Sequence, residues 1–385
     1  MLRSALEARG GQVCFGHRLL DVAQGSDGVL ATVEGPDGTR QTVAADWMIG
    51  SDGGGSTVRR LLEIGRDETP GPDHLVNIFF AADLAELVAG RTFSQCEVAN
   101  ERVQGLFLAM NNTDRWSFHL KYDPLRGPPP AEALPGLVRA ALGCEDRAVE
   151  VISHGTWHTG VAIAHHYRQG RVLLCGDAAH LIPPWGGFNA TTGIADAHNL
   201  AWRLAAVITG QADAATLDDY ARERRPLAVR NGEQALLRTD FDARFGIPTA
   251  RNRAAFAALI DPGALSLRYR YPAAGTGTAQ ALEPVAALQA QCGTRFPHAW
   301  VLCDGKRVST LDLFGRGHVR LAGSTAREDG TVATQDGAAL PVTRLVGRDF
   351  AFADAGVSWR SLTGLPDDGA VVVRPDGFVA WRSHA

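Results

Sequence analysis

The sequence predicts an α/β fold, and three observations lead to this prediction. The stretch Arg171–Val207 has the pattern of a short buried strand, an acidic turn, a Pro/Gly loop and a long helix. Between Asp73 and Tyr122, short apolar or alternating runs are typical of a mostly antiparallel sheet. A Gly/Ala/Thr linker, Pro272–Pro284, then precedes a separate C-terminal α/β unit. We therefore expect segments at 1–72, 73–160, 161–270 and 285–385, of which the first and third form one domain.

Composition and charge exclude several classes of function. With 45% hydrophobic and 21% charged residues, the chain is ordinary for a globular protein. Its formal net charge of −4 gives no reason to expect nucleic acid or a membrane surface as a partner. The six cysteines include no CxxC pair, so neither a metal site nor a redox dithiol is indicated. No apolar run reaches the ~18 residues of a membrane span, and we expect a cytoplasmic protein.

The first segment reads as a helix followed by short strands. Leu2–Arg9 is expected to be helical and Gln12–Phe15 to be a strand. A small antiparallel meander should follow, with glycine-containing turns between its strands, at Arg18–Gln24, Val29–Val33 and Arg40–Ala44. Trp47–Gly50 is then a buried strand that leads into Ser51-Asp52-Gly53.

The second segment is expected to be a sheet with one helix. Its strands are predicted at His74–Ala81, Gly105–Met110, Trp116–Lys121 and Val149–Val161, and its helix at Pro135–Leu142. For any single one of its large apolar side chains, the core of the sheet is the preferred interpretation. These side chains are Phe79, Phe107, Met110, Trp116 and Phe118.

The stretch Arg171–Val207 suits a phosphorylated, hydroxyl-rich ligand. Gly176 and Asp177 end the strand Val172–Cys175, and a carboxylate at that point can accept hydrogen bonds from sugar or ribityl hydroxyls. Pro183, Pro184, Gly186 and Gly187 form a tight loop through which the backbone can approach a ligand closely. The helix, expected from Thr192, would offer unpaired N–H groups at its start. The alternative is an ordinary strand–loop–helix connection.

For two helices of the third segment, the sequence predicts which side chains are buried and which are exposed to solvent. In the helix after the Pro/Gly loop, apolar residues recur at the spacing of one buried face: Ile194, Ala197, Leu200, Ala201 and Leu204. Ala215–Asn231 is expected to form the next long helix. Its cluster Arg222, Arg224 and Arg225 is most simply a solvated face.

A resemblance rests on two motifs. GDAAHLIPPWGGFNATTGIADAHNLAWRLA resembles the second flavin-binding motif of the group A flavoprotein monooxygenases, the FAD enzymes related to para-hydroxybenzoate hydroxylase and phenol hydroxylase. WMIGSDGGGSTVRRLLEIG, Trp47–Gly65, resembles the DG motif of the same family. FPHAWVLCDGKRVSTLDLFGRG, Phe296–Gly317, is similar to the start of the C-terminal domain in the phenol hydroxylase and aromatic polyketide hydroxylase branch.

The resemblance implies a fold and a chemistry. The fold is a Rossmann-like FAD-binding domain, a substrate-binding sheet and a thioredoxin-like C-terminal domain. In the family the sheet covers the aromatic pocket, so the resemblance makes the large apolar side chains of the second segment candidates for lining it: Phe79, Phe107, Met110, Trp116 and Phe118. The chemistry is hydroxylation of a phenolic or polyketide substrate by molecular oxygen through a C4a-hydroperoxyflavin, with NADPH or NADH as reductant, in a protein that often forms a homodimer. A Baeyer–Villiger reaction is an alternative outcome, and the general base, if any, is not indicated. The implied cofactor-binding residues are Asp52, Gly53, Ser56, Arg59, Gly176, Asp177, Pro184, Gly186, Gly187, Asn189, Ala190 and Thr191.

Some of these roles have plain alternatives. Ser56 could be a simple helix N-cap, and Arg59 a solvated helix residue instead of a phosphate ligand. The family also opens with a strand, a GxGxxG turn and a helix that hold the FAD pyrophosphate, and this sequence shows no such unit. Two hypotheses follow. The chain is an FAD-dependent aromatic hydroxylase whose sequence begins late, or it is a flavin-free remnant that binds an aromatic ligand or a partner without turnover.

Overall fold

The structure is a computed structural model that describes residues 1–272, 286–327 and 342–383. The predicted linker Pro272–Pro284 lies outside the described residues, apart from Pro272. Two compact units form: Met1–Glu68 together with Ala162–Ala385, and Thr69–Val161. The finer division of the first unit into a cofactor-binding part and a C-terminal part stays a prediction.

The N-terminal region of the first unit contains the predicted helix and meander. Helix α1 (Leu2–Glu7) precedes three antiparallel strands in the order β1-β2-β3. These strands are β1 (Arg18–Gln24), β2 (Val29–Glu34) and β3 (Arg40–Ala45). The prediction of a strand at Gln12–Phe15 is wrong. That segment is irregular and exposed, and no described strand pairs with its backbone.

Two small sheets form the centre of the first unit. One has the order β12-β13-β4, and its strands β4 (Met48–Gly50) and β13 (Val172–Leu174) are parallel. Strand β12 (Arg168–Gln169) is the antiparallel neighbour of β13. The other sheet has the order β14-β11-β5, with β5 (Arg66–Thr69), β11 (Val161–Ala164) and β14 (His180–Leu181). Strand β13 is buried at every residue, as its uninterrupted apolar sequence predicts.

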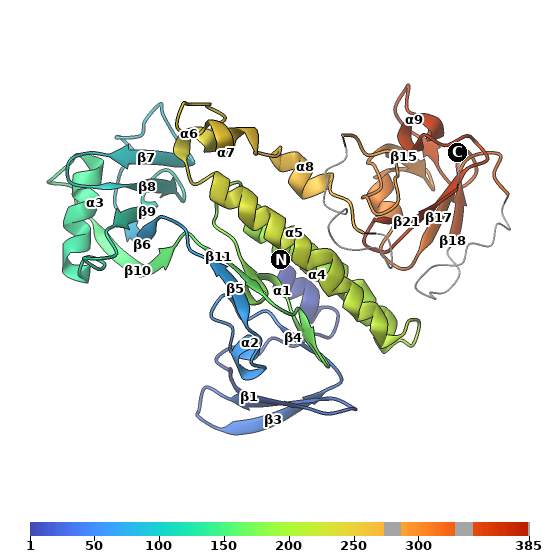
Figure 1. The fold of residues 1–385 in the computed structure, drawn as a ribbon, viewed down its shortest axis with the longest axis horizontal. Helices are drawn as coiled ribbons and strands as arrows, with labels where there is room; N and C mark the ends of the chain where they lie inside the picture. Colours follow the sequence, from blue (N-terminus) through green and yellow to red (C-terminus); the bar gives the residue numbers. More distant parts are fainter. Residues whose placement is uncertain (273–285, 328–341, 384–385) are drawn as a thin grey trace. The chain divides into compact units, whose positions relative to one another are not determined.

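Two long helices pack beside these sheets. Helix α4 (Phe188–Ile208) and helix α5 (Asp218–Leu237) lie side by side (Figure 1). The Tyr220 hydroxyl on α5 donates a hydrogen bond of 2.8 Å to the Leu174 carbonyl, which ties α5 to β13. The shorter helices are α2 (Thr57–Leu61), α6 (Phe241–Arg244), α7 (Arg253–Ala257) and α8 (Pro262–Leu267). Within the described residues, no helix is both long and apolar enough to cross a membrane.

The second unit is an antiparallel sheet covered on one face by a helix. Its order is β10-β6-β9-β8-β7, and helix α3 (Leu134–Leu142) packs on it. The strands are β6 (His74–Ala81), β7 (Gln95–Ala99), β8 (Gln104–Ala109), β9 (Arg115–Tyr122) and β10 (Glu150–His158). Phe107, Trp116 and Phe118 lie in the core under α3, whereas Met110 is 60% exposed. The first three are therefore core residues of the sheet, which is the interpretation that the sequence favoured.

The described residues of the C-terminal region, 286–327 and 342–383, form two further sheets. The larger has the order β18-β17-β20-β21, in which β17 and β18 are parallel and the other pairs are antiparallel. This is the arrangement of a thioredoxin-like sheet. Its strands are β17 (Val319–Ala322), β18 (Val342–Leu345), β20 (Ala370–Val373) and β21 (Val379–Arg382). The smaller sheet contains β15 (Trp300–Cys303), β16 (Lys306–Ser309) and β19 (Ala351–Phe352), and helix α9 (Trp359–Thr363) completes the region.

Candidate functional site

The two sequence motifs meet at one edge of a parallel strand pair. Met48 pairs with Val172 and Gly50 with Leu174, so β4 and β13 end at the same level. The Cys175 N–H donates to the Gly50 carbonyl at 2.9 Å just past that point. Asp52 follows β4 and Asp177 follows β13, and both are exposed. The carboxyl ends of parallel strands are the usual ligand-binding edge of an α/β sheet.

The DG motif forms a capped turn at this edge. The Ser56 hydroxyl donates to Asp52 Oδ1 at 2.5 Å, and the Val58 N–H donates to Asp52 Oδ2 at 3.0 Å. Ser56 is the N-cap of α2 and accepts the Arg59 N–H at 3.0 Å. Gly53 has φ 81°, a left-handed conformation that favours glycine. Asp52 is therefore held in place locally while its carboxylate stays exposed, with lone pairs left for a ligand.

Arg59 is half-buried, and its guanidinium is turned back onto its own helix end. Its Nη1 donates to the Ile64 carbonyl at 2.8 Å. Burial, together with the charges of Arg66 and Arg60, lowers the pKa of Arg59 below its usual range. In this conformation Arg59 stabilises the turn after α2, and a contact with a phosphate would require its side chain to swing away.

The turn after β13 lies directly against α4. Gly176 has φ 61°, and a Cβ built on Gly193 of α4 would lie 3.2 Å from the Gly176 Cα. The Asp177 carboxylate projects from this turn and accepts the Asn189 side-chain amide at 2.9 Å. Glycine at both positions thus permits the close approach that sets Asp177 beside the start of α4.

The Pro/Gly loop and the first turn of α4 form one exposed surface. Gly187, with φ 71°, is the N-cap residue of α4. The prediction that the helix begins at Thr192 is wrong by four residues, because the left-handed Gly187 allows the first turn to start at Phe188. The backbone N–H groups of that first turn have no partner within the helix. The predicted residues that are exposed here are Pro184, Gly186, Gly187, Ala190 and Thr191.

The loop is anchored from beneath. Trp185 is 7% exposed, and the Arg244 guanidinium lies 3.8 Å from the centroid of its ring. The Asn189 Oδ1 accepts the Ile182 N–H at 3.2 Å, which closes the loop between β14 and α4. The exposed proline and glycine residues are therefore held on a fixed support.

The buried face of α4 is polar. The prediction of an apolar buried face is wrong. Ile194 is 71% exposed, and among the five apolar residues from Ile194 to Leu204 that were predicted to form this face, only Leu200 is buried. The residues of α4 that are buried are Phe188, Thr192, Asp196, Asn199, Leu200 and Arg203. The face was mispredicted because carboxylate, amide and guanidinium groups are normally counted as solvent-facing.

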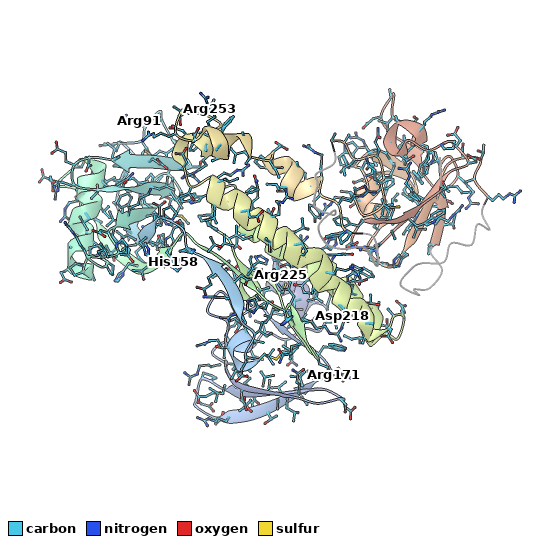
Figure 2. The ribbon with its side chains drawn as sticks, in the orientation of Figure 1. Arg91, His158, Arg171, Asp218, Arg225 and Arg253 are labelled. Carbon is cyan, nitrogen blue, oxygen red and sulfur yellow. The ribbon has the colours of Figure 1, made fainter. Side chains whose placement is uncertain are left out.

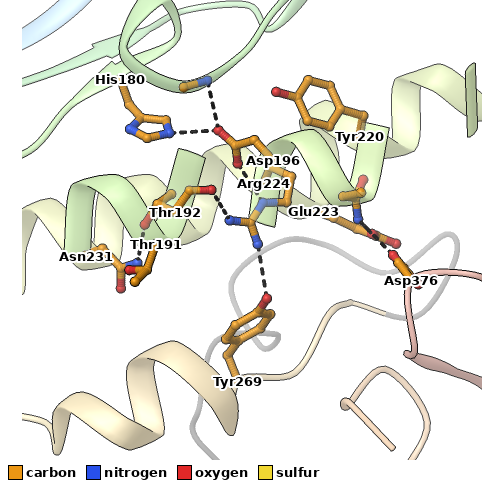
Figure 3. Close-up of polar contacts among 12 residues, drawn as sticks. His180, Thr191, Thr192, Asp196, Tyr220, Glu223, Arg224, Asn231, Tyr269 and Asp376 are labelled. Atoms are coloured by element: carbon orange, nitrogen blue, oxygen red, sulfur yellow. Dashed lines mark hydrogen bonds and ion pairs between the residues drawn. The ribbon is translucent and has the colours of Figure 1, made fainter. Parts of the chain in front are cut away.

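Asp196 is the centre of this polar face (Figure 3). Its Oδ1 accepts Arg224 Nε at 2.7 Å, its Oδ2 lies 2.7 Å from His180 Nε2, and the Gly176 N–H donates to Oδ2 at 3.4 Å. Burial alone would raise the pKa of Asp196, but the charge of Arg224 and the hydrogen bond from His180 hold it below its usual range. Asp196 thus fixes the turn that carries Asp177.

The prediction that the arginine cluster of α5 is a solvated face is wrong for Arg224. This side chain is 1% exposed, and it donates to Asp196, to the Thr192 carbonyl and to the hydroxyls of Tyr269 and Tyr271. Arg225, which is labelled in Figure 2, is half-exposed. It donates to the Ala164 carbonyl at the end of β11 and to Asp67. No local sequence pattern distinguishes the buried Arg224 from the half-exposed Arg225, because the carboxylate partner of Arg224, Asp196, lies 28 residues away in the sequence.

A second buried ion cluster joins α4 and α5 to the C-terminal region. Glu223 accepts Arg203 at 2.8 Å and Arg374 at 2.6 Å, and Arg374 also donates to Asp376 at 2.6 Å. Burial would raise the pKa of Glu223, yet the charges of Arg374 and Arg203 lower it to about 2. Asn199 contacts both Glu223 and Asp376. The sequence did not single out any of these residues.

The sheet of the second unit carries a polar row on the face away from α3. Ser117 donates to Asn77 Oδ1 at 2.5 Å, and its hydroxyl lies 3.5 Å from His119 Nε2. The His119 ring packs edge-on against Trp157, and its Nδ1 is buried with no partner among the described residues. Burial lowers the pKa of His119 below its usual value. On the α3 side, an apolar cavity of about 340 Å³ is lined by residues that include Phe93, Phe107 and Trp116.

The donor set at the strand edge fits FAD. Two exposed carboxylates, Asp52 and Asp177, suit ribityl or ribose hydroxyls, and the free N–H groups at the start of α4 suit an oxygen-rich, partly negative group. A Cβ built on Gly53 or Gly187 would meet nothing within 4 Å, so the surface beside these left-handed residues is open to a ligand. No group of three or more metal-ligating side chains occurs among the described residues.

Comparisons with known proteins agree with this donor set. Residues 1–235 match the family described as "FAD binding domain", and residues 289–385 match "Aromatic-ring hydroxylase, C-terminal". Tetracenomycin A2 monooxygenase-dioxygenase of Streptomyces glaucescens is 36% identical over 100% of this chain and 71% of its own length. The 4-methyl-5-nitrocatechol 5-monooxygenase of a Burkholderia species is 35% identical over 100% of this chain and 73% of its own.

A solved structure supports the same assignment. Aklavinone-11 hydroxylase, in a ternary complex with FAD and aklavinone, superimposes with a TM-score of 0.84 at 31% identity. The superposition covers 99% of this chain and 73% of the hydroxylase. It confirms the mixed α/β fold class and FAD as the cofactor of the fold. The chain therefore belongs to the FAD-binding aromatic-ring hydroxylases, a family of FAD-dependent monooxygenases.

Proposed function

We propose that this chain hydroxylates the ring of a phenol or a polycyclic aromatic polyketide, with molecular oxygen as co-substrate and NADH or NADPH as reductant. The observation that carries the proposal is the meeting of Asp52, Asp177 and the first turn of α4 at the ends of two parallel strands. The names of two relatives that match over the whole chain give tetracenomycin A2 and 4-methyl-5-nitrocatechol as their substrates.

Each residue of the edge has a defined task in this proposal. The carboxylates of Asp52 and Asp177 accept hydrogen bonds from hydroxyls of the FAD chain, and the pairing of β4 with β13 keeps them at one level. The N–H groups of the first turn of α4 stabilise negative charge on the flavin ring, as a helix N-terminus does for any anion. FAD supplies the electron transfer and oxygen activation, whereas the protein positions it and excludes water.

The substrate would be recognised by groups of the second unit. The row of Asn77, Ser117 and His119 offers hydrogen-bonding side chains on one face of a sheet, and Trp157 adds an aromatic surface beside them. Such a combination suits a planar ring that carries phenolic or quinone oxygens. The lowered pKa of His119 favours the neutral imidazole, which can accept a proton from a phenol.

Further parts of the proposal rest on the family resemblance. They are the cofactor roles of Gly53, Ser56, Arg59, Gly176, Pro184, Gly186, Asn189, Ala190 and Thr191, a homodimer, a cytoplasmic location and the domain boundaries at 72, 160, 270 and 285.

The experiment that tests the function begins with FAD binding. The purified chain is incubated with FAD, freed of excess cofactor and examined for a retained flavin spectrum. The loaded protein is then mixed with NADH or NADPH and with aklavinone or 2,4-dichlorophenol under ¹⁸O₂, and the products are analysed by mass spectrometry. Incorporation of one ¹⁸O atom into the ring supports hydroxylation. Insertion of that atom beside a ketone indicates a Baeyer–Villiger reaction, and no retained flavin contradicts the proposal for this chain.

A further inference from the structure

His180 is a fully buried titratable side chain to which the proposed function gives no role. Its side chain is 0% exposed, as is that of its partner Asp196. His180 Nε2 lies 2.7 Å from Asp196 Oδ2 (Figure 3), and its Nδ1 lies 3.3 Å from Asn189 Oδ1. Both nitrogens of the ring therefore face an oxygen atom.

Two other contacts fix the orientation of the Asn189 amide. Its Nδ2 donates to Asp177 Oδ1 at 2.9 Å, and its Oδ1 accepts the Ile182 N–H at 3.2 Å. If the amide were turned over, two oxygens would face each other at Asp177 and two N–H groups at Ile182. The amide oxygen is therefore the atom that faces His180.

The Asp196 carboxylate accepts hydrogen bonds from Arg224 and from the Gly176 N–H, as an ionised group does. Beside an ionised Asp196, a neutral imidazole cannot satisfy both contacts of His180. It carries a single proton, so one nitrogen would direct its lone pair at an oxygen. With the proton on Nε2, the conflict falls on Asn189, and with the proton on Nδ1 it falls on the Asp196 carboxylate, 2.7 Å away. We propose that His180 is an imidazolium that links Asp196 to Asn189 and so holds the Asn189 amide against Asp177.

The surrounding charges are compatible with a buried cation. Asp196 from α4 faces the ring directly, and Arg224 from α5 lies behind that carboxylate. The Tyr167 ring stacks on His180 with centroids 6.4 Å apart. Asp196 carries one negative charge, whereas Arg224 and a protonated His180 together carry two positive charges. The remaining positive charge is balanced by the Asp177 carboxylate, which is connected to His180 through Asn189.

The consequence for the cofactor rests on the proposed function. Asp177 is exposed, and the Asn189 amide is its one described side-chain partner, so this amide decides where the carboxylate points. His180 does not reach the exposed surface itself. It is a positioning residue that acts on FAD through Asn189 and Asp177.

The protonation state can be measured without FAD. We would label the chain with ¹⁵N-histidine and record the ring nitrogens of His180 at pH 7. The signals are assigned by their loss in His180→Gln or, if that variant does not fold, by their shift in Asn189→Ala. Two protonated-type nitrogens are expected. One protonated and one unprotonated nitrogen would overturn the proposal. His165→Gln is the control, since His165 is 47% exposed and pairs with the exposed Asp67, and it should leave the His180 signals unchanged.

The link to Asp177 is tested by FAD titration of the same variants. We expect the dissociation constant to rise about tenfold in His180→Gln and in Asn189→Ala, since each loses one hydrogen bond to a charged group. The His165→Gln control should bind as the parent does. Equal binding by His180→Gln and the parent would refute the positioning role. A parent chain that binds no FAD would instead contradict the proposed function and leave the NMR result standing.

Discussion

Replacement of Arg224 by methionine would isolate the ion pair with Asp196, beneath the proposed cofactor site at the ends of β4 and β13. Arg224 is 1% exposed, and methionine fills a similar length without charge. The change leaves the Asp196 carboxylate buried with only His180 and the Gly176 N–H as partners. Breaking one side of a buried ion pair costs about 3–5 kcal/mol, and we expect about 3 kcal/mol because Asp196 keeps these two contacts. Arg225→Met should cost about 1 kcal/mol or less, since Arg225 and its partner Asp67 are partly exposed.

The measurement is urea unfolding of both variants, with linear extrapolation of the unfolding free energy to water. Asp196→Asn and the double variant complete a thermodynamic cycle, in which the second change should cost much less once the first is made. If Arg224→Met lost no more unfolding free energy than Arg225→Met, the assignment of Arg224 to a buried, stabilising pair would be refuted. Additive losses in the cycle would likewise show that Arg224 and Asp196 act independently.

Three further expectations follow from named groups. Asp177→Ala should raise the FAD dissociation constant about tenfold, yet leave the unfolding free energy within about 0.5 kcal/mol of the parent because the side chain is exposed. For Glu223, a folded-state pKa of about 2 against a usual 4.5 means that the unfolded chain binds the proton first as pH falls. Its contribution, on the order of 3 kcal/mol, is therefore complete above about pH 4.5 and is lost as pH falls towards 2. Urea unfolding of Glu223→Gln should show a flatter pH dependence in that window. Burial raises the pKa of the Cys175 thiol to about 11, so a thiol reagent at pH 8 should label the exposed Cys14 and Cys96, and Cys175 only after unfolding.

Strands were predictable from the sequence because their signal is local. The residues of β1 and β6 match their predicted ranges, since alternation or an apolar run marks a strand over a few residues. Strand β7 was not predicted. It is only five residues long, Gln95–Ala99, and most of these residues are exposed. The isolated segment Gln12–Phe15 shows the opposite case, in which a strand-like sequence has no described partner.

The exposed carboxylates and the glycine-rich loops of the candidate site could also be predicted from the sequence. Asp52 and Asp177 stand directly after apolar runs, and glycine-rich turns mark the loops beside them. The buried ion pairs beneath the site could not be predicted from the sequence, because their partners are far apart along the chain. Asp196 and Arg224 lie 28 residues apart, and Glu223 and Arg374 lie 151 residues apart. A helical pattern that counts apolar residues places such groups in solvent, and only tertiary structure supplies their partners.

Helix α5 connects the proposed cofactor site to the C-terminal region through two neighbouring residues. Arg224 reaches Asp196 beneath the turn of Asp177, and Glu223 reaches Arg374 at the end of β20. The Tyr271 hydroxyl accepts hydrogen bonds from both Arg224 and Asn199, so the two clusters share a member. Without Arg374, Glu223 would be a buried carboxylate that depends on Arg203 and Asn199 alone, at a cost of several kcal/mol. A thioredoxin-like region that has no CxxC pair thus still has a structural role, because it completes the buried ion cluster that stabilises the helices beside the proposed flavin site.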